Sequence, residues 1–288
     1  MKPVQQMVLI FLGMMVIFPA AMHAANIEWR LSSDDLECAQ QMVFDNECAG
    51  KDQNLAAWNE GEDFPSLGLG HFIWYPEGKK GPHQESFRDW MKFLQKEKYP
   101  IPPEIKEMLL GKAPWISKDE FLEQSDSQSM QQLQEFLKAT KPYQVLFISA
   151  RLKKVLPRIL AKVSRARRSE IRYKIQKLVV EPRGISILMD YVNFKGEGIL
   201  KSERYAGQGW GLLQVLEMME IPKGSQNSIQ LFSEAAAKTL TIRVMLAPDE
   251  RDGKRLKGWL KRVQRYVDYE CPGMQPEIET LQKSSSAA

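Results

Sequence analysis

The sequence predicts an α+β fold that is mainly helical. Three segments, 32–50, 151–183 and 255–269, combine charged residues with apolar residues at helical spacing. The short segment 66–71 reads SLGLGH and is followed by several aromatic residues, which is typical of a tight turn beside extended chain. We therefore expect a helical protein with a small β part near this turn.

The N-terminus has the charged, apolar and small-residue order of a secretory signal. Lys2 precedes the apolar run Met7–Phe18, and small residues follow up to Ala24 and Ala25. The run is shorter than the roughly 20 residues that span a bilayer. We expect a signal peptide over residues 1–25 and a periplasmic or secreted mature protein; an uncleaved anchor is the alternative.

Residues 26–271 are long enough for one large domain, and residues 272–288 are predicted to form a disordered tail. The formal net charge of the chain is +4, so its overall charge is nearly balanced. Its histidines and cysteines do not have the spacing of metal ligands, and we expect neither a metal nor a cofactor. A monomer is expected.

The first predicted helix ends in a carboxylate on its apolar side. Ser32 supplies an N-terminal cap and Gly50 a stop. Glu47 continues the apolar stripe, where burial and the negative helix end would raise its pKa. A protonated carboxyl at the wall of a cleft suits a glycosidase general acid. A boundary glutamate that reaches water is the alternative. The stripe consists of Leu36, Ala39 and Val43.

Glu47 and the motif Ser66–His71 together resemble the phage-type lysozymes. In that family a Glu closes the first helix, and a small β-hairpin carries an Asp and a Thr-x-Gly-x-Gly-His motif. The resemblance implies a lysozyme-like fold of two lobes, a small β-hairpin lobe and a larger helical lobe, with a cleft between them. It implies Glu47 as the acid, and His71 as a packed residue that also lines the substrate site.

Weaker similarity continues along the chain. Ile116–Glu120 resembles the start of a helix in the second lobe, and its Ser117 and Glu120 form a capping box. Tyr191–Gly198 is similar to the cleft-lining end of the family's buried helix, which implies a substrate contact for Asn193. The chain is longer than the family in this part, and residues 145–185 are expected to be a basic helical insertion. Ser233–Lys238 and Arg255–Tyr269 match in order and character.

The second carboxylate departs from the family pattern. Ser66 stands where the family has Thr and keeps the hydroxyl that would position a water molecule. Glu60 occupies the ungapped position of the family's Asp, whereas Glu62 or Asp63 would fit if the hairpin has an insertion. Cys48 replaces a Gly. The resemblance therefore implies Glu62 or Glu60 as the partner of the acid.

A glycine-rich loop at 206–211 enters an apolar helix. Its glycines would let the backbone approach a glycan, so Gln208 and Trp210 are expected to contact substrate; a tight turn before a core helix is the alternative. Gly211–Val215 also resembles a turn of the lytic transglycosylases and goose-type lysozymes, which would make Glu203 or Glu197 the acid.

Residues 151–183 contain twelve Lys or Arg residues against two acidic ones, on helices with an apolar inner face. A solvated outer face is one interpretation. Adhesion to an anionic envelope surface is the functional one. Nucleic acid is excluded by the expected compartment.

Three cysteines leave one unpaired in an exported protein. Cys38 and Cys48 lie about 15 Å apart along one predicted helix, too far for a disulfide. A bridge would join one of them to Cys271, and three reduced thiols are the alternative. The resembled fold packs the C-terminal helix nearest to the end that bears Cys48, which implies a Cys48–Cys271 bridge with Cys38 buried.

The resemblance implies hydrolysis of glycosidic bonds in peptidoglycan by carboxylate acid/base catalysis. A lytic transglycosylase acting on the same bond is the first alternative. A non-catalytic cell-wall-binding or interaction protein is the second, because a fold does not guarantee an activity.

Overall fold

The computed structural model describes residues 27, 29–81, 84–109, 111–201, 203–222, 224–225 and 227–272. It confirms an α+β fold that is mainly helical. The predicted signal segment 1–25 and residues 273–288 of the predicted tail lie outside the described residues. Among the described helices, none combines the length and apolar character that crossing a membrane would require.

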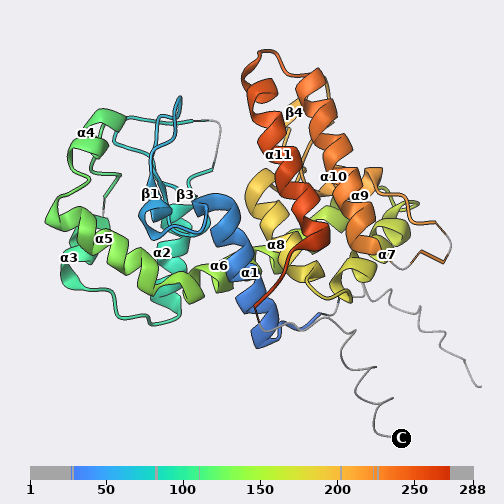
Figure 1. The fold of residues 1–288 in the computed structure, drawn as a ribbon, viewed down its shortest axis with the longest axis horizontal. Coiled ribbons are helices and arrows are strands. Elements are labelled where there is room, and N and C mark those ends of the chain that lie inside the picture. Colours follow the sequence, from blue (N-terminus) through green and yellow to red (C-terminus); the bar gives the residue numbers. More distant parts are fainter. Residues whose placement is uncertain are drawn as a thin grey trace, which may run out of the picture.

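The first half of the chain forms an N-terminal group of elements beside the helix α1 (Figure 1). Short strands and a single helical turn come first, and four short helices follow. These elements are α1 (Ser33–Cys48), η1 (Asp52–Leu55), β1 (Ala56–Ala57), β2 (Ser66–Leu67), β3 (Phe72–Ile73), α2 (Phe87–Lys96), α3 (Pro103–Leu109), α4 (Lys118–Glu123) and α5 (Gln128–Ala139).

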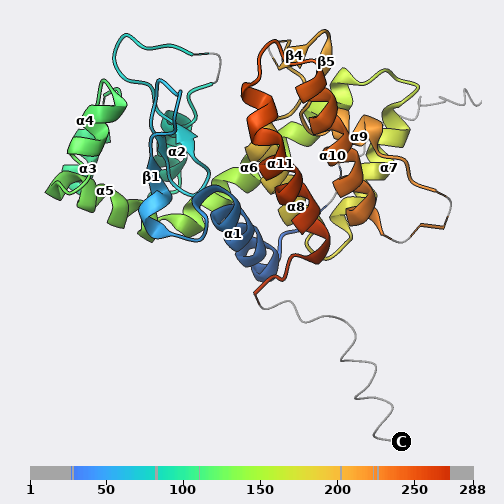
Figure 2. The same cartoon turned by 45° about the horizontal axis from the view of Figure 1, so that its top comes forward.

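The second half forms a C-terminal group of helices with one small hairpin. The long helix α6 (Lys141–Lys162) runs between the two groups, contacting α2 and α5 on one side and α7 and α8 on the other (Figures 1 and 2). The elements of the C-terminal group are α7 (Arg168–Val179), α8 (Gly184–Lys195), β4 (Arg204–Tyr205), β5 (Gln208–Gly209), α9 (Leu212–Met218), α10 (Ser228–Met245) and α11 (Arg251–Asp268).

The first helix begins and ends as the sequence predicts. The Ser32 hydroxyl accepts from the amide of Asp35 at 3.0 Å, and the Asp35 carboxylate accepts from the amide of Ser32 at 3.0 Å. This reciprocal capping box satisfies amides that the first turn leaves without partners. At the other end, Ala49 and Gly50 adopt positive φ values of 50° and 66° and stop the helix.

The apolar face of the basic segment is buried, as the spacing predicts. α6 packs its apolar residues inward and leaves Lys153, Lys154 and Arg158 exposed. Whether residues 145–185 are an insertion stays a prediction. The buried apolar residues are Leu152, Val155, Leu156, Ile159, Leu160 and Val163.

The small sheet fixes the turn that follows β2. Its strands lie antiparallel in the order β1-β2-β3, with Ser66 opposite both Ala57 and Ile73. The turn leaves β2 through Gly68, which has φ +75°. A Cβ atom there would lie 2.6 Å from Oε1 of Gln144 in α6, so only glycine fits between the turn and the helix.

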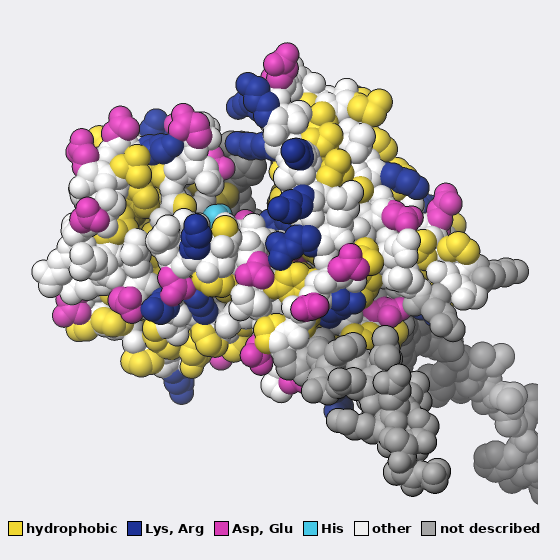
Figure 3. Space-filling model, viewed as in Figure 1, with side chains coloured by type: hydrophobic (Ala, Val, Ile, Leu, Met, Phe, Trp, Pro, Cys, Tyr) yellow, Lys and Arg dark blue, Asp and Glu magenta, His cyan; other side chains and the backbone are white. Residues whose placement is uncertain are grey.

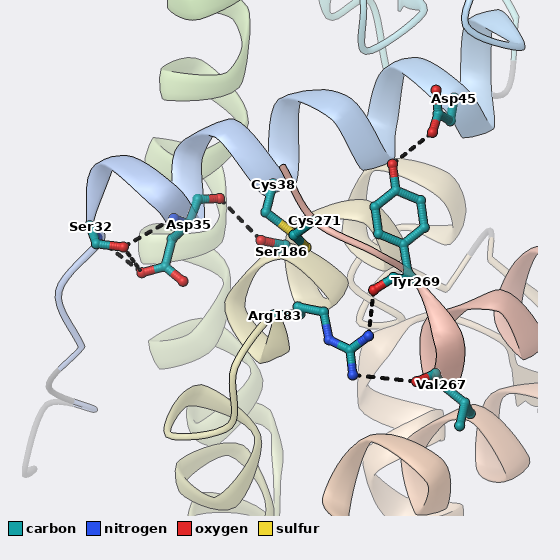
Figure 4. Close-up of a disulfide and its surroundings, with 9 residues drawn as sticks. All are labelled: Ser32, Asp35, Cys38, Asp45, Arg183, Ser186, Val267, Tyr269 and Cys271. Carbon is teal, nitrogen blue, oxygen red and sulfur yellow. Dashed lines mark hydrogen bonds between the residues drawn. A yellow bond between two sulfur atoms is a disulfide. The ribbon is translucent and has the colours of Figure 1, made fainter. Parts of the chain in front are cut away.

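The predicted Cys48–Cys271 disulfide is wrong: Cys271 is bonded to Cys38, and Cys48 is a buried free thiol. α11 meets the C-terminal end of α1, but the chain then runs back along α1 towards its N-terminal half. The Tyr269 hydroxyl donates to Asp45 at 2.7 Å on this path (Figure 4). Helical spacing alone left Cys38 open as the other possible partner of Cys271, and Cys38 is the correct one.

Arg183 anchors the segment that carries Cys271. Its guanidinium donates to the carbonyl oxygens of Val267 and Tyr269, where α11 ends (Figure 4). Beside the disulfide, the Ser186 hydroxyl donates to the carbonyl of Asp35 at 3.1 Å. The start of α8 thus holds both ends of the described fold together.

Removing the bridge by Cys271→Ser is expected to lower the free energy of unfolding by about 3–5 kcal/mol, because the bond closes a loop with a sequence separation of 233. Urea unfolding of the oxidised protein measures it. Cys48→Ala is the matched control and should keep the bridge, as peptide mapping would show. Equal stability of the reduced and oxidised wild-type protein would contradict this expectation.

Candidate active site

Glu47 lies in the last turn of α1, where three other parts of the chain meet. Its Oε1 accepts from Nη2 of Arg262 in α11 at 2.8 Å and from Nδ2 of Asn193 in α8 at 3.2 Å. Its Oε2 lies 3.6 Å from Nδ1 of His71, in the turn after β2. The side chain retains 15% of its exposure, so the carboxylate is enclosed but still open to the surface.

The expectation that Glu47 has a raised pKa is wrong. Burial does raise it, but the charges of Arg262 and His71 and the hydrogen bonds from Arg262 and Asn193 outweigh burial, so the pKa of Glu47 is lowered. The apolar stripe of α1 gave no sign of these partners, of which Arg262 lies 215 residues away in the sequence. The resting carboxylate is therefore ionised at neutral pH.

Arg262 is held by a second, fully buried carboxylate. Its Nε and Nη2 donate to the two oxygens of Asp190 at 3.0 and 2.7 Å, and the hydroxyl of Tyr266 also donates to Asp190. Asp190 and Asn193 lie one turn apart on α8, as do Arg262 and Tyr266 on α11. One arginine thus joins α1, α8 and α11 through two carboxylates.

Sequence reasoning did not identify Asp190 or Arg262. Asp190 carried a usable signal, since a lone carboxylate in the apolar segment 184–194 must find a buried partner. Arg262 carried none, because it is one of many basic residues on α11.

His71 contacts Glu47 from a turn whose backbone is strained at this residue. Its φ is +46°, and its Nε2 lies 3.3 Å from the carbonyl of Asn54 and 3.8 Å from Sγ of Cys48. The Gln144 side chain accepts from the amide of Leu69 and so ties the same turn to α6. His71 is packed, as expected, and it also contacts the candidate acid directly.

Asn193 links the turn to the acid. Besides Glu47, its Nδ2 donates to the carbonyl of Gly70 at 3.2 Å. A Cβ atom on Gly70 would lie 3.1 Å from Oδ1 of Asn193 and closer still to the ring of Phe72, so the glycine permits this approach. Ser66, by contrast, is buried within β2.

Cys48 lies behind the carboxylate. Burial and the neighbouring charge of Glu47 raise the pKa of its thiol to about 12, so it stays protonated and unreactive. In place of the expected disulfide, its Sγ contacts Nε2 of His71 and so links α1 to the turn.

The predicted partner carboxylates have partners of their own. Glu60 is ion-paired with Lys118 in α4 at 2.5 Å, which lowers its pKa, and its side chain is 93% exposed. Glu62 accepts from Nδ2 of Asn59 at 3.0 Å. Asp63 lies 3.8 Å from Lys79 and is also exposed. Of these three carboxylates, Glu62 is the least exposed.

Gln208 and Trp210 belong to the β4–β5 hairpin and the residue after it. The carbonyl of Trp210 accepts from the hydroxyl of Tyr191 in α8 at 2.9 Å, and its ring lies under the guanidinium of Arg243. The side chain of Gln208 donates to the carbonyl of Gly209. These contacts place both residues along the C-terminal group rather than against Glu47.

Glu197 and Glu203 lie beyond the end of α8. Burial raises the pKa of both carboxyls, and each has one fully buried oxygen without a hydrogen-bond partner. Arg158 of α6 donates to Glu197 at 2.8 Å.

The surface is hollowed between the N-terminal and C-terminal groups (Figure 3). Basic side chains gather along the wall that α11 forms. Within the described residues, no three His, Cys, Asp or Glu side chains gather as a metal site would need. The exposed basic residues of α11 are Arg251, Lys254, Arg255, Lys257, Lys261 and Arg265.

No protein-family model matches the chain, and neither curated proteins nor solved structures gave a match.

Arg262→Gln is expected to lower the free energy of unfolding by about 3–5 kcal/mol at neutral pH, because it leaves buried carboxylate charge unpaired. The folded-state pKa of Glu47 is lowered from its usual 4.5, so the stability contributed by its ion pair is present above that pH and is lost as the pH falls through the folded pKa. The difference in the free energy of unfolding between the variant and the wild type should therefore become smaller in acid.

Urea unfolding of both proteins between pH 3 and 7 would measure this difference. Arg265→Gln, on the same helix but 44% exposed, is the control and should change stability by no more than about 1 kcal/mol. If Arg262→Gln loses the same free energy of unfolding at every pH in this range, the pKa of Glu47 does not depend on Arg262.

Proposed function

We propose that the protein cleaves glycosidic bonds in peptidoglycan, with Glu47 as the catalytic acid, and that its two groups of elements are the two lobes of a lysozyme-like fold. The observation that carries the proposal is the position of Glu47. It lies in the last turn of the first helix, where it contacts side chains from both groups, and it meets the Ser66–His71 turn through His71 and Asn193. This combination of helix end and turn is the one that the sequence motif implies.

In this reaction Glu47 protonates the glycosidic oxygen as the bond to the anomeric carbon breaks, and water then adds to that carbon. The ionised resting state means that the reaction runs through the protonated minority of Glu47. The rate of the reaction therefore depends on how strongly Arg262 and Asn193 stabilise the negative charge of Glu47. A substrate that displaces or shields these donors would increase the reactive fraction.

One observation favours a lytic transglycosylase as the second candidate. Glu60 and Asp63 are exposed and paired with lysines, so a rigid second carboxylate is not supplied by them. A transglycosylase needs a single acid, because a hydroxyl of the sugar itself attacks the anomeric carbon and forms an anhydro end.

The third candidate is a cell-wall-binding protein without activity. The ion pair of Glu47 favours it, because an ionised carboxylate has no proton to donate.

Export and adhesion belong to the same proposal. The Cys38–Cys271 disulfide supports an oxidising compartment such as the periplasm or the exterior. The exposed basic residues of α6 and α7 support attraction to an anionic envelope surface.

Glu47→Gln should lower turnover by about 10²- to 10⁴-fold, since the amide keeps the shape of the side chain but cannot donate the proton. Zymography of the mature protein on peptidoglycan, with mass analysis of the products, is the measurement. A hydrated product identifies a hydrolase and an anhydro end a transglycosylase. Glu37→Gln, exposed on the same helix, is the control.

If the wild-type protein does not clear peptidoglycan at any pH, the enzymatic proposal fails and the binding protein is supported. If Glu47→Gln clears it as well as wild type, another residue is the acid.

Among the hairpin carboxylates, Glu62→Gln should reduce turnover more than Glu60→Gln or Asp63→Asn. Glu62 is less exposed, and its backbone carbonyl is fixed by the indole of Trp58 at 2.7 Å. The same assay compares the three variants. Equally mild losses would favour the reaction with a single acid.

A further inference from the structure

The turn 68–71, which carries His71, is held through its backbone. The amide of Gly68 donates to the carbonyl of Leu55 at 2.6 Å, and the amide of His71 donates to the carbonyl of Gly68 at 3.0 Å. Between them, the amide of Leu69 donates to Oε1 of Gln144 in α6. The middle of the turn is thus held by a side chain, which a single substitution can remove.

The side-chain amide of Gln144 faces the turn in a fixed orientation. Gln144 is fully buried, and its Nε2 donates to the carbonyl of Leu137 at 2.7 Å and to the hydroxyl of Thr140 at 3.0 Å. Both acceptors lie where α5 ends and α6 begins. A flipped amide would place Nε2 against the amide of Leu69 and Oε1 against a carbonyl, so it would lose these bonds. Oε1 therefore points at the turn.

The next two residues of the turn contact the candidate acid. The carbonyl of Gly70 accepts from Asn193, which also donates to Glu47. Nδ1 of His71 lies 3.6 Å from Oε2 of Glu47. The turn is therefore held from two sides, by α6 at the amide of Leu69 and by α8 at the carbonyl of Gly70.

Removing the acceptor on Gln144 would leave a buried donor without a partner, because Leu69 is fully buried. A buried amide in this state favours any shift of the turn that brings it to water. Such a shift changes the distance between His71 and Glu47, and the interaction of two charged groups weakens as they separate.

We propose that Gln144 is a positioning residue of the candidate site: from α6 it holds the turn 68–71 in the place where His71 contacts Glu47. Its hydrogen bonds go to Leu69, Leu137 and Thr140, so it acts on Glu47 through the turn. That Glu47 is the acid rests on the proposed function, whereas the effect of Gln144 on its charge does not.

The proton affinity of Glu47 reports on this contact. Burial raises the pKa of Glu47, whereas the charges of Arg262 and His71 lower it. Cys48 and Lys195 are the other titratable groups among the described residues with an electrostatic interaction with Glu47. Of these four groups, His71 is the one that the turn carries. Displacing the turn should therefore raise the pKa of Glu47 while Arg262 stays in place.

Gln144→Met keeps the length of the side chain and removes its acceptor. Carbon-13 NMR titration of the glutamate carboxyls in the full mature protein measures the result, with the signal of Glu47 assigned through its loss in Glu47→Gln. The acid dissociation constant of Glu47 should fall by about threefold or more. The matched control is Gln214→Met, which should leave that constant unchanged. Gln214 is also a buried amide, and it donates to the carbonyl of Gly198 at 3.0 Å in the C-terminal group.

His71→Asn tests the route, since asparagine tolerates the positive φ of this position. In that background Gln144→Met should change the dissociation constant of Glu47 by less than about twofold. On peptidoglycan, the decline of activity at high pH should move to higher pH in Gln144→Met, because an acid with a raised pKa keeps its proton longer.

An unchanged dissociation constant in folded Gln144→Met would overturn the proposal, as would an equal change in Gln214→Met or the same change with and without His71. If Gln144→Met does not fold, Gly68→Ala takes its place and should lower the constant too, since a Cβ atom there would lie 2.6 Å from Oε1 of Gln144. A protein that shows these changes but does not clear peptidoglycan keeps the positioning role and loses the enzymatic function. A protein that clears peptidoglycan without them does the reverse.

Discussion

The ion pairs of Arg262 organise the centre of this protein. Two carboxylates, Asp190 and Glu47, are enclosed in a region that would otherwise penalise their charge, and one guanidinium pairs with both. Because the three groups come from α8, α1 and α11, their pairing also ties these helices together. The remaining contacts of the site, from Asn193 and His71, are arranged around a carboxylate whose charge is already fixed.

The same arrangement explains why the site has conflicting properties. A proton donor needs a raised pKa, and burial in the last turn of α1 acts in that direction. The charges of Arg262 and His71 and the hydrogen bonds from Arg262 and Asn193 act in the opposite direction, and together they outweigh burial. The chemistry of Glu47 is thus coupled to the charge of its surroundings, and any group that changes the position of Arg262 changes the reactivity of the acid.

Local patterns in the sequence predicted the helices well. The limits of α1 follow from Ser32 and the residues around Gly50, and the buried face of α6 follows from its spacing, since both depend on neighbours a few residues away. The errors involve distant partners. The lowered pKa of Glu47 depends on Arg262 of α11, and the pairing of Cys271 with Cys38 depends on how the chain returns along α1 after α11. Neither can be predicted from a periodic pattern.

The late position of Arg262 and Cys271 in the chain imposes an order on folding. A nascent polypeptide emerges from its N-terminus, so α1 and α8 are available while α11 is still absent. Until then Asp190 and Glu47 lack their counterion, and Cys38 lacks its partner. The first helix can pack against α6 and α8 before this point, but its ion pair and its disulfide can form only after α11 and Cys271 have emerged. A product that stops before α11 would keep both carboxylates and the thiol of Cys38 unpaired with these partners.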